Sequence, residues 1–484
     1  MSMNEDKNFD VRNAQLRRNT IGLSHIVFFV VAAAAPMTSI VGATPAAFAL
    51  GNGAGVPGAF ILAGILYLIF SVGYTTLARY VKGAGAFYTY IAQGMGKPAG
   101  LGGALIAIMT YFTLQIAIYT LFGIYASAIA TALGVVVPWW VWAFAVLAIV
   151  ALCGRRNIES SGHILGICMI AEIAILVLLD IAIIIHAGHG SAKKLSLTGF
   201  HPSEIFSRGL GITLVFVFSS FIGFEATAIF GEEAKKPERT IPRATYIAVT
   251  IIMVFYAFTS WAVVQYYGPE HIKTIAASSL NNFYFNVAQA LIGPWSVDVM
   301  NILMLTSMFA SLLSAHNTIN RYFFALAREG LAWRFMAKVH VKHGSPHLAG
   351  LIQVVLVIAT ILMFVVIHAN PYTVVFSWLA AIAILGIISV QVLVSLAVII
   401  FFHRDKHNCS VLTTIIAPAV AAIGLSGAFL LVSSNMSLLT GSTSPVAKFL
   451  PLVVIIIGFT GVVLALRVRH SRPDTYARLG KSIN

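Results

Sequence analysis

Charged residues are scarce in this chain: Asp, Glu, Lys and Arg together make up 10% of its 484 positions. Soluble globular domains carry about 25% charged residues, so a surface that lies wholly in water is excluded. Hydrophobic residues account for 59% of the chain. A helix that crosses a bilayer needs about 20 predominantly apolar residues. The composition therefore indicates an integral membrane protein that has the lipid bilayer as a partner.

Cysteines are few and recognisable catalytic motifs are absent. The three cysteines form no CxxC pair, which excludes a disulfide framework and a thiol redox motif. The phosphate-binding pattern GxxxxGK[ST] and the nucleophile elbow GxSxG are also missing. The histidine runs lie in basic loops without Cys or HExxH partners and are interpreted as solvated side chains: His340, His343, His347, His403 and His407. The sequence thus predicts that the chain is not an enzyme, has no metal site and needs no cofactor.

The apolar stretches divide into about twelve candidate membrane spans. They predict an all-α integral membrane protein, and we expect each boundary to be correct to about four residues. The spans lie at 21–50, 57–80, 98–131, 138–153, 158–187, 206–230, 242–268, 285–325, 348–369, 371–402, 411–433 and 446–467.

Basic residues are distributed unevenly, although the net charge is +14. With a cytoplasmic N-terminus, the loops on that side hold all of the 30 Lys and Arg residues except Lys193, Lys194, Arg208, Lys273 and Lys448. An excess of Lys and Arg is typical of short cytoplasmic loops. We therefore expect a multi-pass protein of the cell (plasma or inner) membrane with both termini cytoplasmic, and no nucleic-acid partner. The first 20 residues mix both charge signs, so we expect no cleaved signal peptide.

The span at 206–230 contains polar residues at mid-length. Ser219, Ser220 and Gly223 precede Glu225, and apolar residues resume afterwards. A carboxylate deep in hydrocarbon is costly and by default faces a cavity, a partner or a substrate. An interrupted helix leaves backbone groups that survive at this depth only inside protein or along water. The pattern predicts a break at Ser219–Gly223 and a binding site in the middle of the membrane.

The span at 21–50 has a matching interruption. Pro36 and Pro45 each remove a helical hydrogen bond, and Gly42 between them loosens the backbone. A kinked but continuous helix is the alternative interpretation. We expect a break at Thr38–Ala43 that faces the break in the other span at mid-depth. Interrupted helices at corresponding positions of two five-helix halves indicate the site of a secondary transporter.

Three segments resemble the amino acid–polyamine–organocation (APC) transporter superfamily. They are FIGFEATAIFGEEAKKPERTIPRA at 221–244, NRYFFALAREGLAWRFMAKVH at 320–340 and GAGAFYTYIAQGMGKPAG at 83–100. Two residues depart from the family pattern: Lys236 stands where Asn is usual, and Glu329 where Asp is usual. The three segments follow the family's order along the chain.

The resemblance implies the LeuT-type fold, a 5+5 inverted repeat with broken helices 1 and 6 plus two extra helices. The expected divisions are a cytoplasmic N-terminal tail at 1–20, a first repeat at 21–187, a second repeat at 206–402, two extra spans at 411–467 and a cytoplasmic C-terminal tail at 468–484.

The expected binding residues follow from the charges of an amino acid. The broken end of the first span would offer N–H groups to a carboxylate, and carbonyls near the second break would accept an ammonium. Tyr111 and Gln115 share one face of the third span, which the family fold sets beside the site, although interhelical contact is the other interpretation. The predicted set is Thr38, Ser39, Ile40, Val41, Gly42, Ala43, Tyr111, Gln115, Ser219, Ser220, Phe221, Ile222, Gly223 and Phe224.

Two buried carboxylates are candidates for coupling or gating, Glu172 and Glu225. Glu172 lies near the middle of its span, at about the part of the fifth helix where some family members have a coupling lysine. Asp180, two turns further on, is interpreted as structural. The eighth span lacks the adjacent hydroxyl pair that sodium-coupled relatives use. We therefore favour the proton over sodium as the coupling ion and Glu172 as the coupling acid.

The sequence predicts a permease that moves a small amino acid or related amine by alternating access, as a proton-coupled symporter. The alternatives are an exchanger of amino acids or amines, and a transporter of polyamines or organic cations. A membrane sensor that uses the transporter fold is a more remote alternative. The identity of the solute and the oligomeric state do not follow from these residues.

Overall fold

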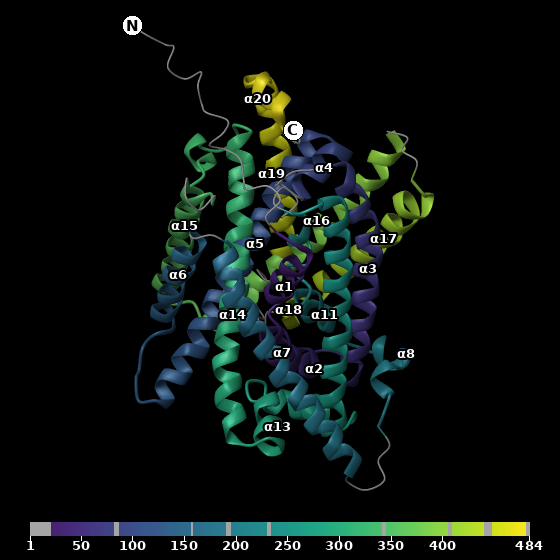
Figure 1. Cartoon of the computed structure of the whole chain (residues 1–484), viewed down its shortest axis with the longest axis vertical. Coiled ribbons are helices and arrows are strands. Elements are labelled where there is room, and N and C mark those ends of the chain that lie inside the picture. The colour runs from purple at the N-terminus through teal and green to yellow at the C-terminus, as the bar shows by residue number, and fades with distance from the viewer. Residues whose placement is uncertain are drawn as a thin grey trace.

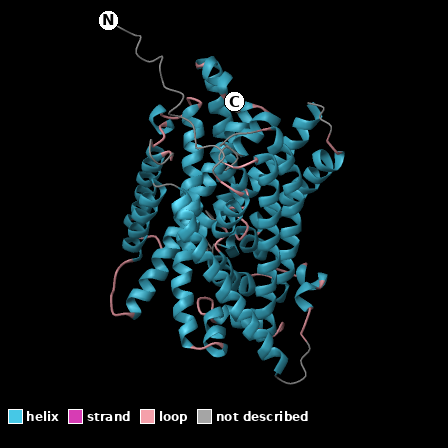
Figure 2. Ribbon diagram, in the orientation of Figure 1, coloured by secondary structure: helices cyan, strands magenta, loops and turns pink. Residues whose placement is uncertain are grey.

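A computed structural model of the chain describes residues 21–81, 87–155, 158–189, 195–229, 234–340, 345–404, 409–439 and 448–480. The tail expected at 1–20 lies outside these residues. The described residues form helices and loops and contain no extended strand (Figure 2). The predicted fold class is therefore confirmed.

Within the described residues, ten helical stretches are long and apolar enough to cross a membrane, and two shorter apolar helices accompany them. The long stretches are Leu23–Leu50, Gly53–Tyr80, Lys97–Ala132, Gly166–Ala187, Pro237–Tyr267, Pro294–Arg328, His347–Val366, Pro371–Arg404, Leu412–Ser434 and Leu450–Ser471, and the short helices are Trp139–Arg155 and Leu210–Ser219. Each corresponds to one of the predicted spans. The multi-pass architecture expected from composition is confirmed.

The principal elements in chain order are α1 (Leu23–Ala33), η2 (Thr38–Ala43), α2 (Thr44–Leu50), α3 (Val56–Tyr80), α4 (Phe87–Met95), α5 (Lys97–Ala132), α6 (Trp139–Arg155), α7 (Ile158–His189), α9 (Leu210–Ser219), α10 (Ala226–Ile229), α11 (Pro237–Tyr267), α13 (Phe283–Leu291), α14 (Pro294–Arg328), α15 (His347–Val366), η7 (Pro371–Phe376), α16 (Ser377–Arg404), α17 (Ala417–Ser434), α19 (Leu450–Ser471) and α20 (Pro473–Arg478).

One predicted span is two helices. The sequence predicts a continuous span at 285–325, whereas the structure has α13 and then α14. Gly293 between them has φ of +117°, a conformation that glycine adopts at little cost. Pro294 then starts α14 at a position where its missing N–H costs nothing. These two residues turn the chain.

The helices run between two faces of the molecule (Figure 1). We call the face with α4 and α20 the tail face, and the opposite face the α13 face. α5 lies at the centre and contacts α4, α6, α14, α16 and α19. At one place α5 and α19 touch through backbone, because a Cβ on Gly461 would lie 2.7 Å from the Gly102 Cα. Small residues at such crossings let membrane helices approach closely.

Apolar side chains cover the periphery of the bundle. On α19, Ile455, Ile456 and Phe459 are exposed, Phe459 by 67%. A continuous apolar surface of this kind is costly in water but suits contact with acyl chains. The outer helices therefore present the surface expected of a protein in a bilayer.

Candidate functional site

The first helix break lies at Pro36. α1 ends at Ala33, because the residue before a proline is driven out of the right-handed helical region. Ala35 has φ of +48°, a left-handed conformation that is uncommon for a non-glycine residue. The chain then re-enters a helix whose Thr38–Ala43 segment is π-helical. The predicted loss of regular α-helical bonding over Thr38–Ala43 is present in this form. The break itself lies earlier than predicted, at 34–35, since the effect of a proline falls on the residue before it.

Side chains from other helices bind the backbone just after this break. The Met37 N–H donates to Glu172 Oε2 on α7 at 3.3 Å, and the Thr38 N–H donates to Ser307 Oγ on α14 at 3.3 Å. The Glu172 carboxylate also receives a hydrogen bond from Ser307. Glu172 is thus joined directly to the discontinuous part of the first span.

The second break lies between α9 and α10. Residues 220–225 form a turn, and Gly223 at its centre has φ of +115°. The Ile222 and Phe224 N–H groups donate to the Ser219 and Phe221 carbonyls, and the Ala226 N–H, just after the turn, donates to the Gly223 carbonyl. Among the described residues, the Ser220 and Ile222 carbonyls therefore have no N–H partner. The predicted break at Ser219–Gly223 is present and extends to Glu225.

The two breaks face each other. A Cβ on Gly223 would lie 3.0 Å from Ala33 Cβ and 3.7 Å from the Ala34 nitrogen. Gly223 therefore serves contact between the two broken spans, and it does not line the cavity described below. Gly42 does line that cavity, although a Cβ there would meet the flexible end of Met304 at 2.8 Å.

Glu225 is the last residue of the second break, at its tail-face end. Its carboxylate accepts hydrogen bonds from the Tyr111 hydroxyl and, at 3.0 Å, from the Gly223 N–H. The Tyr74 hydroxyl donates to the Glu225 carbonyl at 2.7 Å. Beside these groups, Tyr67 packs on Phe218, Phe221 and Phe224 with ring centroids 4.9–5.3 Å apart. This layer closes the tail side of the breaks.

A cavity of about 270 Å³ lies on the other side of the breaks. It extends from the breaks to Leu50 and Tyr372, which are 44% and 40% exposed near the α13 face. Its lining residues are Ala33, Ala34, Ala35, Thr38, Ser39, Gly42, Ala43, Ala46, Leu50, Leu114, Ala117, Ile118, Leu121, Val215, Phe216, Ser219, Ile222, Leu280, Ser311, Tyr372, Thr373, Phe376, Ser377, Ala380 and Ile384. The arrangement is closed toward the tail face and approachable from the α13 face.

Six of the predicted binding residues line this cavity: Thr38, Ser39, Gly42, Ala43, Ser219 and Ile222. Ile40, Val41, Phe221 and Phe224 belong to the buried hydrophobic core. Ser220 donates to the Phe216 carbonyl. The predicted roles of these residues remain predictions.

Tyr111 and Gln115 do not line the cavity. Tyr111 binds Glu225, and Gln115 accepts a hydrogen bond from Gln353 on α15 and donates weakly to Tyr119. The polar face of α5 is therefore an interhelical face. The adjacent face of α5, formed by Leu114, Ala117, Ile118 and Leu121, lines the cavity.

Sequence reasoning missed the contribution of η7 and α16 to the cavity. Tyr372, Thr373, Phe376, Ser377, Ala380 and Ile384 come from this segment. The N–H groups of Tyr372 and Thr373 donate to the Asn370 side chain at 3.0 and 2.9 Å, which fixes the start of the segment. The Asn-Pro pair at 370–371 signals a helix start, but nothing in the sequence connects that start to the site.

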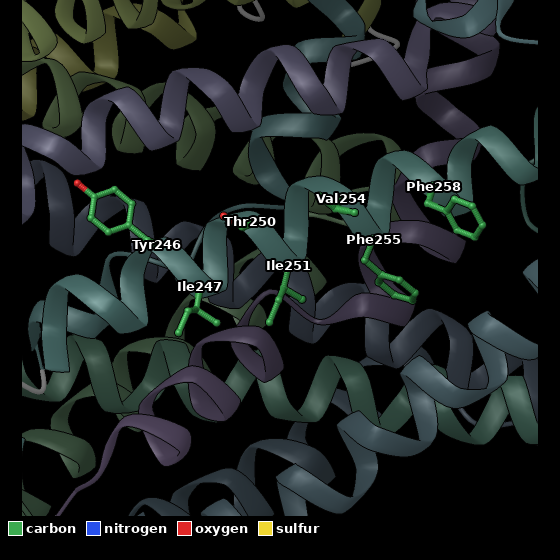
Figure 3. Close-up of a pocket in the computed structure, with 7 residues that line it drawn as sticks. All are labelled: Tyr246, Ile247, Thr250, Ile251, Val254, Phe255 and Phe258. Atoms are coloured by element: carbon green, nitrogen blue, oxygen red, sulfur yellow. The ribbon is translucent and has the colours of Figure 1, made fainter.

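A second hollow, of about 610 Å³, lies along α11 (Figure 3). Its seven lining residues all belong to this one helix: Tyr246, Ile247, Thr250, Ile251, Val254, Phe255 and Phe258. Several are exposed, Val254 by 53%. A groove walled by a single helix and lined mainly by apolar side chains suits lipid chains. It offers a solute no enclosing groups.

The described residues contain no group of three or more His, Cys, Asp or Glu side chains placed to hold a metal ion. His343 and His407, from the histidine runs, lie outside the described residues. The rings of His340 and His347 contact each other, with centroids 5.3 Å apart.

Comparison with known proteins identifies the family. A family model described as amino acid permease matches residues 21–462. The chain is similar to the low-affinity putrescine importer PlaP of Escherichia coli K12, at 23% identity over 297 residues, 60% of this chain and 63% of the relative. It is similar to the branched-chain amino acid permease BcaP of Bacillus subtilis 168, at 21% identity over 320 residues, 61% and 65% of the two chains. It is also similar to the gamma-aminobutyric acid permease of E. coli K12, at 25% identity over 309 residues, 61% and 63% of the two chains.

The chain covers less than two thirds of the length of each of these relatives. The family model, in contrast, matches nearly the whole chain, including both helix breaks and the segments that line the cavity. This chain therefore belongs to the amino acid permease family of the APC superfamily.

Proposed function

We propose that the chain is a secondary transporter that moves a small amino acid or related amine across the cell membrane by alternating access. The observation that carries the proposal is the cavity at two facing helix breaks, which is approachable from the α13 face and closed toward the tail face. A transporter that works by alternating access needs a binding site that is open to one side of the membrane and closed to the other. The names of the relatives indicate three kinds of solute: a diamine, branched-chain amino acids and an ω-amino acid.

Glu172 is the proposed coupling acid, and the proton is the proposed coupling ion. The carboxylate accepts the Met37 N–H at the first break, and Met37 is followed by Thr38, which lines the cavity. A protonated carboxyl is a weaker acceptor than a carboxylate. Binding of a proton at Glu172 would therefore weaken its hydrogen bond with the Met37 N–H at the first break. Protonation of Glu172 would in this way change the shape of the site.

Glu225 is the proposed inner gate. Its bonds to Tyr111 and to the Gly223 N–H hold the closed layer together. Opening toward the tail face requires these bonds to rearrange. If Glu172 proves structural, Glu225 is the second candidate for the coupling acid.

The tail face is the proposed cytoplasmic face. Arg79, Lys97, Arg328 and Arg404 lie at the ends of α3, α5, α14 and α16, in the segments that the charge distribution assigns to the cytoplasm. We further propose that residues 21–187 and 206–402 are the two inverted repeats, since each contains one broken helix.

The test is uptake of radiolabelled amino acids and amines into proteoliposomes that contain the purified full-length chain. Acidification of the outside should drive accumulation in the parent protein. Glu172→Gln should bind and exchange solute but fail to accumulate it, because the amide keeps the shape of the side chain and cannot cycle a proton.

Asp180→Asn is the matched control. Asp180 lies two turns along α7 from Glu172, is equally buried, and accepts a hydrogen bond from Thr259 at 2.8 Å. This variant should still accumulate solute. Accumulation by Glu172→Gln equal to the parent would show that Glu172 is structural. A parent that responds to sodium but not to pH would overturn the proton proposal.

A further inference from the structure

The cavity contains no charged side chain. Among the residues that line it, all of them described, none is Asp, Glu, Lys, Arg or His. The nearby carboxylates are directed elsewhere, Glu172 to the Met37 N–H and Glu225 to Tyr111 and the Gly223 N–H. Any charge on a bound solute must therefore be met by hydroxyls and by backbone groups.

Hydroxyls line the cavity both beside the helix breaks and near its mouth, where Tyr372, Thr373 and Ser377 lie, but only the end at the breaks adds backbone groups freed by the interrupted helices. Thr38 lines the cavity, and its Oγ1 atom is buried without a hydrogen-bond partner. The Ile222 carbonyl, on the facing break, has no N–H partner among the described residues. A buried polar atom without a partner is rare in folded proteins. Together they offer a hydroxyl donor and a carbonyl acceptor to one small group that carries both charges.

The walls beyond the breaks are mostly apolar. α5 supplies Leu114, Ala117, Ile118 and Leu121, and further apolar side chains come from α9, the loop before α13 and α16. An apolar group of the solute gains free energy on burial against these walls. A charged group placed there would lose its hydration without gaining a partner.

We propose that the substrate is a neutral α-amino acid with an apolar side chain, of about the size of leucine or methionine. The proposal rests on the transport function proposed above and names its substrate class. An α-amino acid carries both charges on one carbon, so both fit at the polar end while the side chain occupies the apolar end. A single water needs about 10–15 Å³ of such a cavity, so about 270 Å³ leaves room for the nine non-hydrogen atoms of leucine.

Solutes with separated charges do not fit this arrangement. Putrescine has an ammonium at each end, and γ-aminobutyric acid has its two charges at opposite ends. Each would place one charge against the apolar wall. We expect both to bind at least about 100-fold more weakly than leucine, because an unpaired buried charge is costly and each tenfold in affinity corresponds to only about 1.4 kcal/mol.

The experiment is equilibrium binding of tritiated leucine to the purified full-length chain, with competition by unlabelled solutes. The competitors are isoleucine, methionine, phenylalanine, alanine, lysine, glutamate, putrescine and γ-aminobutyric acid. Leucine, isoleucine and methionine should compete best. Lysine, glutamate, putrescine and γ-aminobutyric acid should compete at least about 100-fold more weakly.

Ala380→Leu tests whether this cavity sets the selectivity. Ala380 lines the cavity on α16 and is partly exposed to it. A larger side chain there should weaken leucine and phenylalanine binding at least tenfold while leaving alanine binding within about twofold, because it removes space from the apolar end. Ala128→Leu is the matched control, since Ala128 is an exposed residue of α5 that does not line the cavity. The control should keep the selectivity of the parent.

The outcomes separate the two proposals. Transport of putrescine or γ-aminobutyric acid in preference to apolar amino acids would overturn the substrate class and leave the transport proposal standing. Preference for lysine or glutamate would do the same. If uptake assays with every one of these solutes show neither binding nor movement, the proposed function itself is wrong. Equal loss of alanine and leucine binding in a folded Ala380→Leu protein would contradict the placement of the side chain.

Discussion

The C-terminal segment should leave the tail face as pH rises. α20 lies at the tail face (Figure 1), and it and the residues after it bond to Gln93 of α4, Lys97 of α5 and Glu329 just after α14. Lys97 Nζ donates to the Tyr476 and Ala477 carbonyls at 2.7 and 3.0 Å. The Gly480 N–H donates to Glu329 Oε1 at 3.2 Å, and Leu479 is 1% exposed. Glu329, just after α14, is thus covered by the segment that binds it.

Burial raises the pKa of Glu329 from 4.5 to about 7, while hydrogen bonds from Tyr88 and Gly480 and the charges of Arg328 and Lys97 oppose the shift. When the segment departs, the carboxyl regains water and its pKa falls. The docked form therefore binds the proton more tightly. The stabilisation is fully present below the pKa of the free form and is lost as pH rises through about 7.

The size of the effect follows from the docked pKa. Between pH 6 and pH 8, a carboxyl with a pKa of about 7 loses its proton in the docked state. The free form is already ionised at both values. Linkage then gives a shift of about 1.4 kcal/mol, or roughly tenfold, toward the undocked form.

Hydrogen–deuterium exchange of the peptide that covers 473–480 measures this change once the rates are corrected for intrinsic exchange. Protection should fall about tenfold from pH 6 to pH 8 in the parent. Glu329→Gln, which stays neutral, should show the same protection at both values. Equal protection of the parent at both pH values, or an unchanged response in Glu329→Gln, would refute the reasoning.

The remaining predictions concern the breaks. Gly223→Ala should lower the stability of the purified protein by about 1–3 kcal/mol, because φ of +115° is disfavoured and the new Cβ approaches Ala33; thermal unfolding in detergent measures this, and an unchanged Tm would contradict it. Tyr111→Phe removes a donor to the buried Glu225 carboxylate and should weaken the closed layer by about 1.5–3 kcal/mol. A cysteine introduced at Ile222 should then react faster with reagents from the tail face, and an unchanged rate would show that the bond does not hold the gate. Thr38→Val should keep or raise stability, since the hydroxyl has no partner, yet weaken leucine binding about tenfold; unchanged binding would remove Thr38 from the site.

The helix breaks were predictable because residues with strong local effects cause them. Gly223 adopts a positive φ, and the hydroxyl residues before it mark the end of the helix. Pro36 breaks the first span, but its effect falls on Ala35. Alanine by itself favours a helix, so only attention to the residue before the proline would have placed that break correctly.

The apolar lining of the cavity was not predictable from one sequence. Leu114 and Ile118 on α5 have the same character as residues that face lipid, and only the position of α16 shows that they face a cavity. The prediction for the third span rested on its polar residues, Tyr111 and Gln115. These polar groups form hydrogen bonds with residues of other helices. Nearly all buried polar groups in folded proteins have a hydrogen-bond partner, so a buried polar side chain in a bundle need not face a ligand.

Glu172 and Glu225 perform a shared structural task. A helix break leaves backbone N–H groups without their normal acceptors, and each break has one such group bound by a carboxylate: Met37 by Glu172 and Gly223 by Glu225. The acids therefore replace lost helical acceptors and do not line the cavity. In the mechanism proposed above, this separation would let the cavity wall select the solute while the acids respond to movement of the breaks. A change of substrate would then require changes in the apolar wall alone, with the coupling groups left in place.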